Sequence, residues 1–285
     1  GSYKIMEAND IITNLNYLLE KVFKSIEGEI FKTLDKLTII GPEILKEEPL
    51  KNIVFENKVN GLVIIANTLI LFFVIYYVFK QLIGIYNGNK IESIYVFIIR
   101  IIIVCIIVNF SYYICEEILN IFGILGESID TYASDLINRK VTFENLKDSI
   151  INIENIINTD LVSLDGIIKG IISFGSVSIL ISFSVRYVTV IFLIIISPLA
   201  FVCLSSNLTS GIFNMWVKML IVNLTVQIGI KLLIFIPLAY KNQNDIIYKI
   251  ILVGTISLIY KFNIFIKELL ARISNENNVK NIFKD

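Results

Sequence analysis

The chain contains no histidine and three cysteines, and charged residues make up 18% of its 285 positions. Without histidine, the commonest general acid-base group and a common metal ligand are missing. Cys105, Cys115 and Cys203 lie in apolar segments, whereas disulfide frameworks and zinc sites need cysteines clustered on loops. These scarcities argue against a disulfide scaffold or a zinc protein, and the sequence predicts no metal and no cofactor.

An excess of positive charge is also lacking, because 25 Lys and Arg balance 25 Asp and Glu. Nothing resembles the basic stripe of a protein that reads duplex DNA. The phosphate-binding pattern GxxxxGK[ST] does not occur, so the chain shows no ATP-driven module of its own. The long apolar segments contain no carboxylate in their interiors. The sequence therefore predicts a protein that is not an enzyme, and it disfavours proton-coupled transport.

What the chain has in abundance is apolar sequence, since 55% of its residues are hydrophobic. From Gly170 to Val217 the only charged residue is Arg186. A bilayer core takes about 20 apolar residues of helix per crossing, and backbone amides in lipid must bond within their own segment. The sequence predicts an all-α polytopic membrane protein, and we expect it in the cell membrane.

Five apolar segments predict five transmembrane helices, at about 59–79, 93–115, 167–185, 187–204 and 215–240. A shorter segment at 246–260, interrupted by Lys249, leaves a sixth crossing open. Lys and Arg counts on the two sides tie under the positive-inside rule. Because no cation follows the second segment before Arg139, we favour five spans with an external N-terminus.

These segments divide the chain into five regions, which are 1–58, 59–115, 116–169, 170–260 and 261–285. The first holds an amphipathic helix over 10–37, which either packs on its own membrane domain or else lies in the membrane interface or binds a partner subunit. The second holds the first two spans. The third is a large loop with two helical patterns that suggest a cap or docking surface. The fourth holds the remaining spans, and the fifth is a polar tail.

Polar residues recur at helical spacing within the spans. They are Ser178, Ser182, Arg186 and Thr189, which share a face if the helix runs unbroken through Arg186; Asn223, Gln227 and Lys231; and Arg100 with Ser111. One interpretation is a passage or subunit interface that favours anions. The other is hydrogen bonding between helices, with long side chains extending to the interface.

Two further features concern helix geometry. Gly166 and Gly170 form a GxxxG pattern, which predicts a close helix contact. Pro198 lies within the fourth predicted span and should kink it.

Several short motifs then suggest a family. They are Asp165-Gly166-Ile167-Ile168-Lys169, Arg186-Tyr187, Ser197-Pro198-Leu199-Ala200-Phe201, Trp216-Val217-Lys218 and Gln227, with Glu48-Pro49-Leu50, Ser111-Tyr112 and Cys115-Glu116 upstream. With these motifs, residues 36–260 resemble the TrbL-type inner-membrane subunits of type IV secretion and conjugation systems, in their Gram-positive form.

The resemblance implies about five or more spans and a large extracytoplasmic loop between early spans. It implies assembly with other secretion subunits, including separate ATPases that supply energy. The expected function is a channel or scaffold subunit that helps pass DNA or protein across the membrane. DNA enters only as a transported substrate, and homo-oligomerisation is left open.

The alternative function is a stand-alone transporter or permease component for a small anionic or amphipathic solute. The same span cations motivate it. A permease predicts a closed cavity near Arg186 and Lys231 within one chain.

Overall fold

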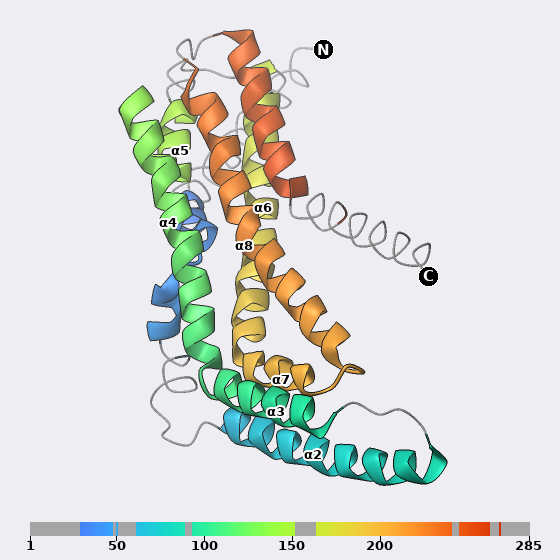
Figure 1. Ribbon diagram of the computed structural model, residues 1–285. Coiled ribbons are helices and arrows are strands. Elements are labelled where there is room, and N and C mark those ends of the chain that lie inside the picture. Colours follow the sequence, from blue (N-terminus) through green and yellow to red (C-terminus); the bar gives the residue numbers. More distant parts are fainter. Residues whose placement is uncertain are drawn as a thin grey trace, which may run out of the picture. The chain divides into compact units, whose positions relative to one another are not determined.

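The computed structural model describes residues 29–47, 50, 61–88, 93–151, 164–240, 245–262 and 268. All regular structure in these residues is helical, which confirms the predicted all-α class (Figure 1). The elements are a helix over 29–38, η1 (Pro42–Lys46), α2 (Gly61–Asn87), α3 (Ile94–Asn109), α4 (Ser111–Ile137), α5 (Phe143–Ile151), α6 (Leu164–Ile195), α7 (Ser197–Val202), η3 (Cys203–Ser205), α8 (Ser210–Leu238) and a helix over 246–262.

Three of these helices are long and apolar enough to cross a membrane: α2, α8 and the Gly170–Ile195 part of α6. A fourth crossing is added if α3 and α4, which meet at a 66° bend, form one broken span. The chain is therefore a membrane protein with several apolar helices. The described residues contain three or four such helices, so the count of five or six is not confirmed.

Helix α6 is continuous through Arg186, which from the sequence could lie either between the third and fourth predicted spans or within one of them. One arginine does not break a helix, and no proline or glycine follows Gly175 before the helix ends at Ile195. Pro198 then lies in the first turn of α7, where its missing N–H costs nothing. Pro198 starts a new short helix and does not kink a longer one.

The second predicted span is interrupted at Phe110, between α3 and α4. Phe110 has φ −98° and ψ 8°, outside helical geometry, although its N–H still bonds the Ile106 carbonyl. Arg100 and Ser111 therefore lie on different helices, and the face they were expected to share does not exist. Helix α4 joins the end of that span to the first helix of the predicted loop.

In the part of α4 that belongs to unit 1, residues 124–137, the buried face is the small-residue face. Gly126 and Ala133 are buried, whereas Leu125, Tyr132 and Leu136 of the expected apolar stripe are exposed. Large apolar residues pointing outward and small residues at helix contacts are typical of helices in lipid. The same part of α4 also exposes Glu127 and Asp135, so its outward face mixes apolar and charged side chains.

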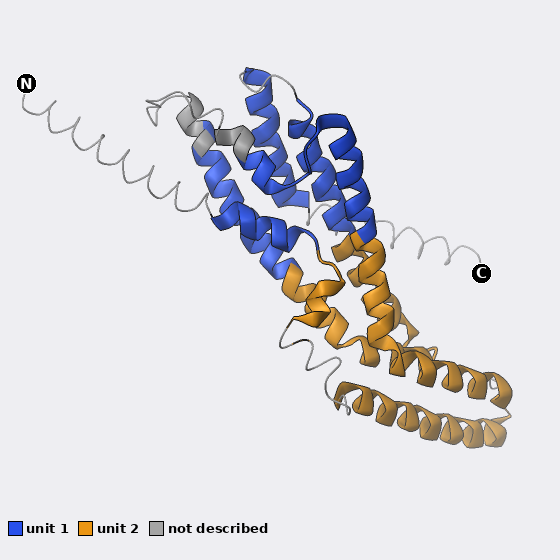
Figure 2. Ribbon diagram, turned by 90° about the vertical axis from the view of Figure 1, so that its left-hand side faces the viewer, with its two compact units in different colours: residues 1–39, 124–186, 225–285 blue, residues 40–123, 187–224 orange. Residues whose placement is uncertain are grey.

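The chain forms two compact units, which are unit 1 (residues 1–39, 124–186 and 225–285) and unit 2 (residues 40–123 and 187–224) (Figure 2). The helix over 29–38 buries Phe31 and Leu34 in the core of unit 1. The described part of the amphipathic N-terminal helix thus packs on its own domain. The remainder of the 10–37 prediction lies outside the described residues.

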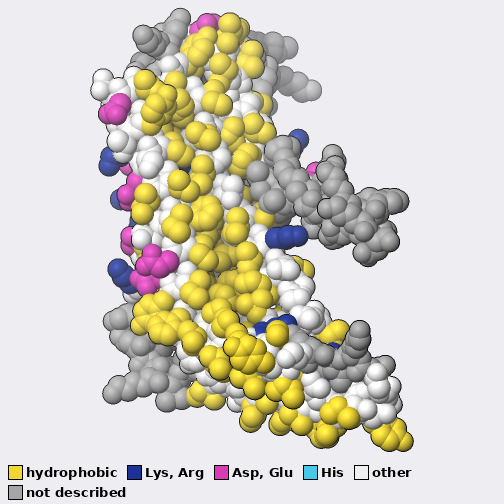
Figure 3. All heavy atoms as spheres, in the orientation of Figure 1, with side chains coloured by type: hydrophobic (Ala, Val, Ile, Leu, Met, Phe, Trp, Pro, Cys, Tyr) yellow, Lys and Arg dark blue, Asp and Glu magenta, His cyan; other side chains and the backbone are white. Residues whose placement is uncertain are grey.

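Apolar side chains cover much of the surface, as Figure 3 shows for one face. Helix α2 is an extreme case, because only 17% of its most apolar window is buried. Phe72, Phe79 and Tyr86 of α2 are all exposed. Soluble monomers rarely expose contiguous apolar patches of more than a few hundred Å², so this surface fits a protein solvated by lipid.

Within unit 1, the helix over 246–262 approaches α6 and α8 most closely at two glycines. A Cβ added to Gly175 would lie 2.6 Å from the Ile256 Cγ2, and one added to Gly229 would lie 2.2 Å from the Phe262 ring. At Gly170 an added Cβ would meet nothing within 4 Å. The close contact predicted for the GxxxG pattern is therefore absent at Gly170 and occurs at Gly175 instead.

We predict opposite effects for alanine at two glycines of α6. Gly175→Ala forces the stiff, buried Ile256 to move, and such overpacking costs about 1–3 kcal/mol. Gly170→Ala has free space and gains up to about 1 kcal/mol of helix propensity. Thermal unfolding of the detergent-purified protein measures both. Equal midpoints for the two variants would contradict the glycine contact.

Candidate functional site

The buried cation of α8, Lys231, is paired within unit 1. Its side chain is 2% exposed, and its ammonium group forms a hydrogen-bonded ion pair with the Asp130 carboxylate of α4. The same nitrogen donates to the Gly126 carbonyl at 3.0 Å. Unpaired charges in a low-dielectric interior are costly, and removing one partner of a buried pair typically costs about 3–5 kcal/mol. These two contacts of Lys231 connect α8 to α4.

The sequence analysis missed Asp130, because it searched for acids only inside the apolar segments. Asp130 lies in the predicted loop, 101 positions from Lys231 along the chain. A local signal does exist, since Gly126, Asp130 and Ala133 follow the i, i+4, i+7 spacing of one helix face. An acid on a small-residue face indicates a position turned toward other helices.

Arg186 of α6 is 1% exposed and binds the end of a neighbouring helix in unit 1. Its Nη2 donates to the Leu37 and Thr38 carbonyls at 2.7 and 2.6 Å. These carbonyls end the helix over 29–38, where backbone acceptors lack helical partners and the dipole favours a cation. The guanidinium also lies 5.1 Å from the centre of the Phe183 ring. Arg186 therefore caps this helix from a different element.

The helix over 29–38 is fastened at a second point by Asp35. Its carboxylate accepts the N–H groups of Phe143 and Glu144, at 2.6 and 3.0 Å, which begin α5. A carboxylate at a helix N-terminus satisfies free donors and complements the dipole. Burial raises the pKa of Asp35, although the two backbone hydrogen bonds act in the opposite direction. Asp35 thus caps α5 while Arg186 caps the helix that carries Asp35.

The two residues predicted to share a face with Lys231 are also enclosed by the protein. Asn223 and Gln227 are 2% and 1% exposed, and Lys231 shares their face as the spacing predicted. The Asn223 amide donates back to the Met219 carbonyl of its own helix at 2.7 Å. The Asn223 Oδ1 is buried without a hydrogen-bond partner among the described residues.

The polar face of α6 behaves similarly. Ser178 is half-buried and donates to the Phe174 carbonyl of its own helix at 3.0 Å. Ser182 is also half-buried. Because α6 is continuous, both share the predicted face with Arg186. The face is present, and its one charge points into unit 1.

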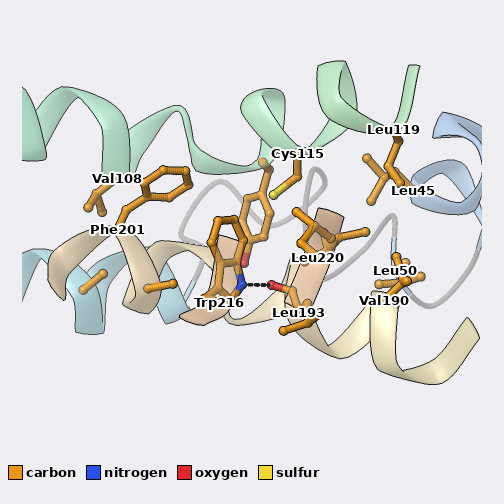
Figure 4. Packing of buried hydrophobic residues seen from close by; sticks show 14 of the residues in the cluster. Leu45, Leu50, Val108, Cys115, Leu119, Val190, Leu193, Phe201, Trp216 and Leu220 are labelled. Atoms are coloured by element: carbon orange, nitrogen blue, oxygen red, sulfur yellow. Dashed lines mark hydrogen bonds between the residues drawn. The ribbon is translucent and has the colours of Figure 1, made fainter. Parts of the chain in front are cut away.

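The remaining predicted residues lie in unit 2. Arg100 of α3 is half-buried and Lys218 of α8 is exposed. Pro198 is buried at the start of α7. Trp216 is 4% exposed, and its indole N–H donates to the Leu193 carbonyl of α6 at 2.9 Å (Figure 4).

The described residues contain no group of His, Cys, Asp and Glu able to hold a metal ion. The site they do form is a set of charge contacts that join helices within unit 1. The chain matches no protein-family model, and no curated protein or solved structure matches it. Its function is therefore argued from geometry and from the resemblance of its motifs.

We predict that Arg186→Met loosens the helix over 29–38. The Leu37 and Thr38 carbonyls would lose their donor, and an unsatisfied buried acceptor costs about 1–3 kcal/mol. That cost corresponds to roughly 5- to 150-fold more frequent local opening. Hydrogen exchange of the peptide covering 29–38 measures it. Arg100→Met, in unit 2, is the control and should leave this peptide unchanged. Wild-type protection in Arg186→Met would show that the cap is dispensable.

Proposed function

We propose that the chain is a channel or scaffold subunit of a conjugative type IV secretion machine in the cell membrane. In this role it helps pass DNA or protein across the bilayer, while separate ATPases supply the energy. Five spans, an external N-terminus and contacts with other secretion subunits belong to the same proposal. The motifs that resemble TrbL-type subunits motivate it.

The observation that carries the proposal is the packing of several of those motifs in one cluster of unit 2, with Tyr112, Cys115, Phe201 and Trp216 in its core, whereas Asp165–Lys169 and Gln227 belong to unit 1. The Trp216 ring packs at a tilt against Phe201, with ring centres 5.3 Å apart. Tyr112 donates its hydroxyl to the Ile195 carbonyl at 3.3 Å, just before the Ser197-Pro198 motif. Tyr187 donates to the Glu47 carboxylate at 3.2 Å. Residues that are far apart in the sequence thus pack together. Motifs shared by proteins of one fold would be expected to do so.

The charge contacts of unit 1 favour a scaffold role over a lining that touches nucleic acid. Proteins hold the phosphate backbone with accessible Lys and Arg side chains. Lys231 and Arg186 are buried and already bound to groups of their own chain. The same observation weakens the permease alternative, which needs both cations to face a solute cavity.

Deleting the gene tests the proposal directly. We expect transfer of conjugative DNA to recipient cells to fall to background and to return when the wild-type gene is supplied in trans. Normal transfer from the deletion strain would refute the proposal.

A pair of variants in the complementing gene refines the test. Trp216→Ala removes the centre of the motif cluster and should abolish complementation, whereas Tyr86→Ala, at a side chain that is 91% exposed, should complement. Immunoblotting of the membrane fraction separates loss of the protein from loss of its action.

A further inference from the structure

Unit 2 contains an apolar groove between α4 and α8. Helix α4 contributes Ile118, Ile121 and Phe122, and α8 contributes Trp216, Val217 and Ile221. Its volume is about 170 Å³, and no polar surface lines it. The groove is open on one side, where Ile121 and Ile221 are 56% and 45% exposed. Its occupant must therefore be apolar and must be able to enter from the surface.

Water is a poor occupant of such a space. An engineered apolar cavity of about 150 Å³ in another protein stays dry and binds benzene, because water there finds no hydrogen-bond partner. Trp216 contributes the only N–H among the side chains named above, and this N–H donates to the Leu193 carbonyl (Figure 4). The indole thus presents only its apolar ring to the groove.

The position of the groove identifies what is available to fill it. Helix α8 is long and apolar enough to cross a membrane, and α4 forms a bent apolar pair with α3. The medium around such helices is hydrocarbon. A volume of about 170 Å³ is similar to that of the benzene-binding cavity, which suits a short length of unbranched hydrocarbon chain.

We propose that this groove is a lipid-binding site that holds part of one acyl chain of a membrane phospholipid. The acyl chain enters between Ile121 and Ile221 and lies against the Trp216 ring. The site fills the space between α4 and α8 with an apolar ligand that the bilayer always supplies. It is independent of the proposed role in secretion.

Trp216 provides a direct test, because it is the only tryptophan of the chain. The full-length protein is reconstituted in vesicles of phosphatidylcholine with brominated acyl chains, which quench tryptophan at close range. It is then transferred into excess unbrominated phosphatidylcholine in detergent. We expect Trp216 to remain quenched by at least one third. A reporter variant, Trp216→Phe with Phe72→Trp, places the tryptophan on the exposed face of α2. Its fluorescence should recover fully after the transfer into unbrominated lipid.

Variants that fill the groove provide a second test of lipid binding. Val217→Phe should abolish the retained quenching, and the matched control Ile212→Phe, at an exposed position of α8 outside the groove, should leave it intact. An unchanged Trp216 emission maximum in unbrominated lipid verifies the fold of each variant. Full recovery of wild-type fluorescence on transfer overturns the proposal, as does retained quenching in Val217→Phe. Cross-linking of Ile121→Cys to a second chain, with no lipid retained, assigns the groove to a protein partner instead.

Discussion

A charge inside a membrane protein needs a partner, because hydrocarbon offers no water to solvate it. Unit 1 supplies a counter-charge to Lys231 and two carbonyl acceptors to Arg186, whose Nε and Nη1 have no hydrogen-bond partner among the described residues. The Lys231 ammonium binds the Asp130 carboxylate, and the Arg186 guanidinium binds the carbonyl end of the helix over 29–38. Asp35 extends the series by capping α5. The arrangement of helices in unit 1 depends on these contacts.

The same constraint explains which features were predictable from sequence. The helical class, the bounds of α8 to within a few residues and the shared face of Asn223, Gln227 and Lys231 follow from hydropathy and the period of the helix. Such patterns are local. They identify a buried cation but not its partner, which here lies 101 positions away in the chain.

Helix ends were the weaker part of the prediction. From the sequence Arg186 could lie at a boundary because charges usually flank spans, yet α6 continues because the guanidinium finds acceptors inside unit 1. No proline or glycine lies near the bend at Phe110, so no local sequence signal predicts it. The continuation of α6 and the bend at Phe110 both depend on tertiary contacts, which a local sequence pattern does not reveal. At Pro198 the predicted kink was wrong, because α6 has already ended and the proline lies in the first turn of α7.

Unit 2 is held together differently, by aromatic packing and backbone hydrogen bonds around Trp216. Its buried core uses side chains from α3, α4, α6, α7 and α8, and it contains many of the residues that resemble TrbL-type subunits. The proposed role in a larger membrane machine draws on this resemblance.

The central claim is that the buried cation of α8, Lys231, is structural because Asp130 of the same chain neutralises it. Exchanging the two charges, with Asp130→Lys and Lys231→Asp in one chain, tests it most directly. Each single change places two like charges together and should prevent folded protein from accumulating in the membrane. The exchanged variant restores an ion pair and should recover most of the folded protein, as measured by size-exclusion chromatography in detergent. An exchanged variant no better than either single change would contradict the claim.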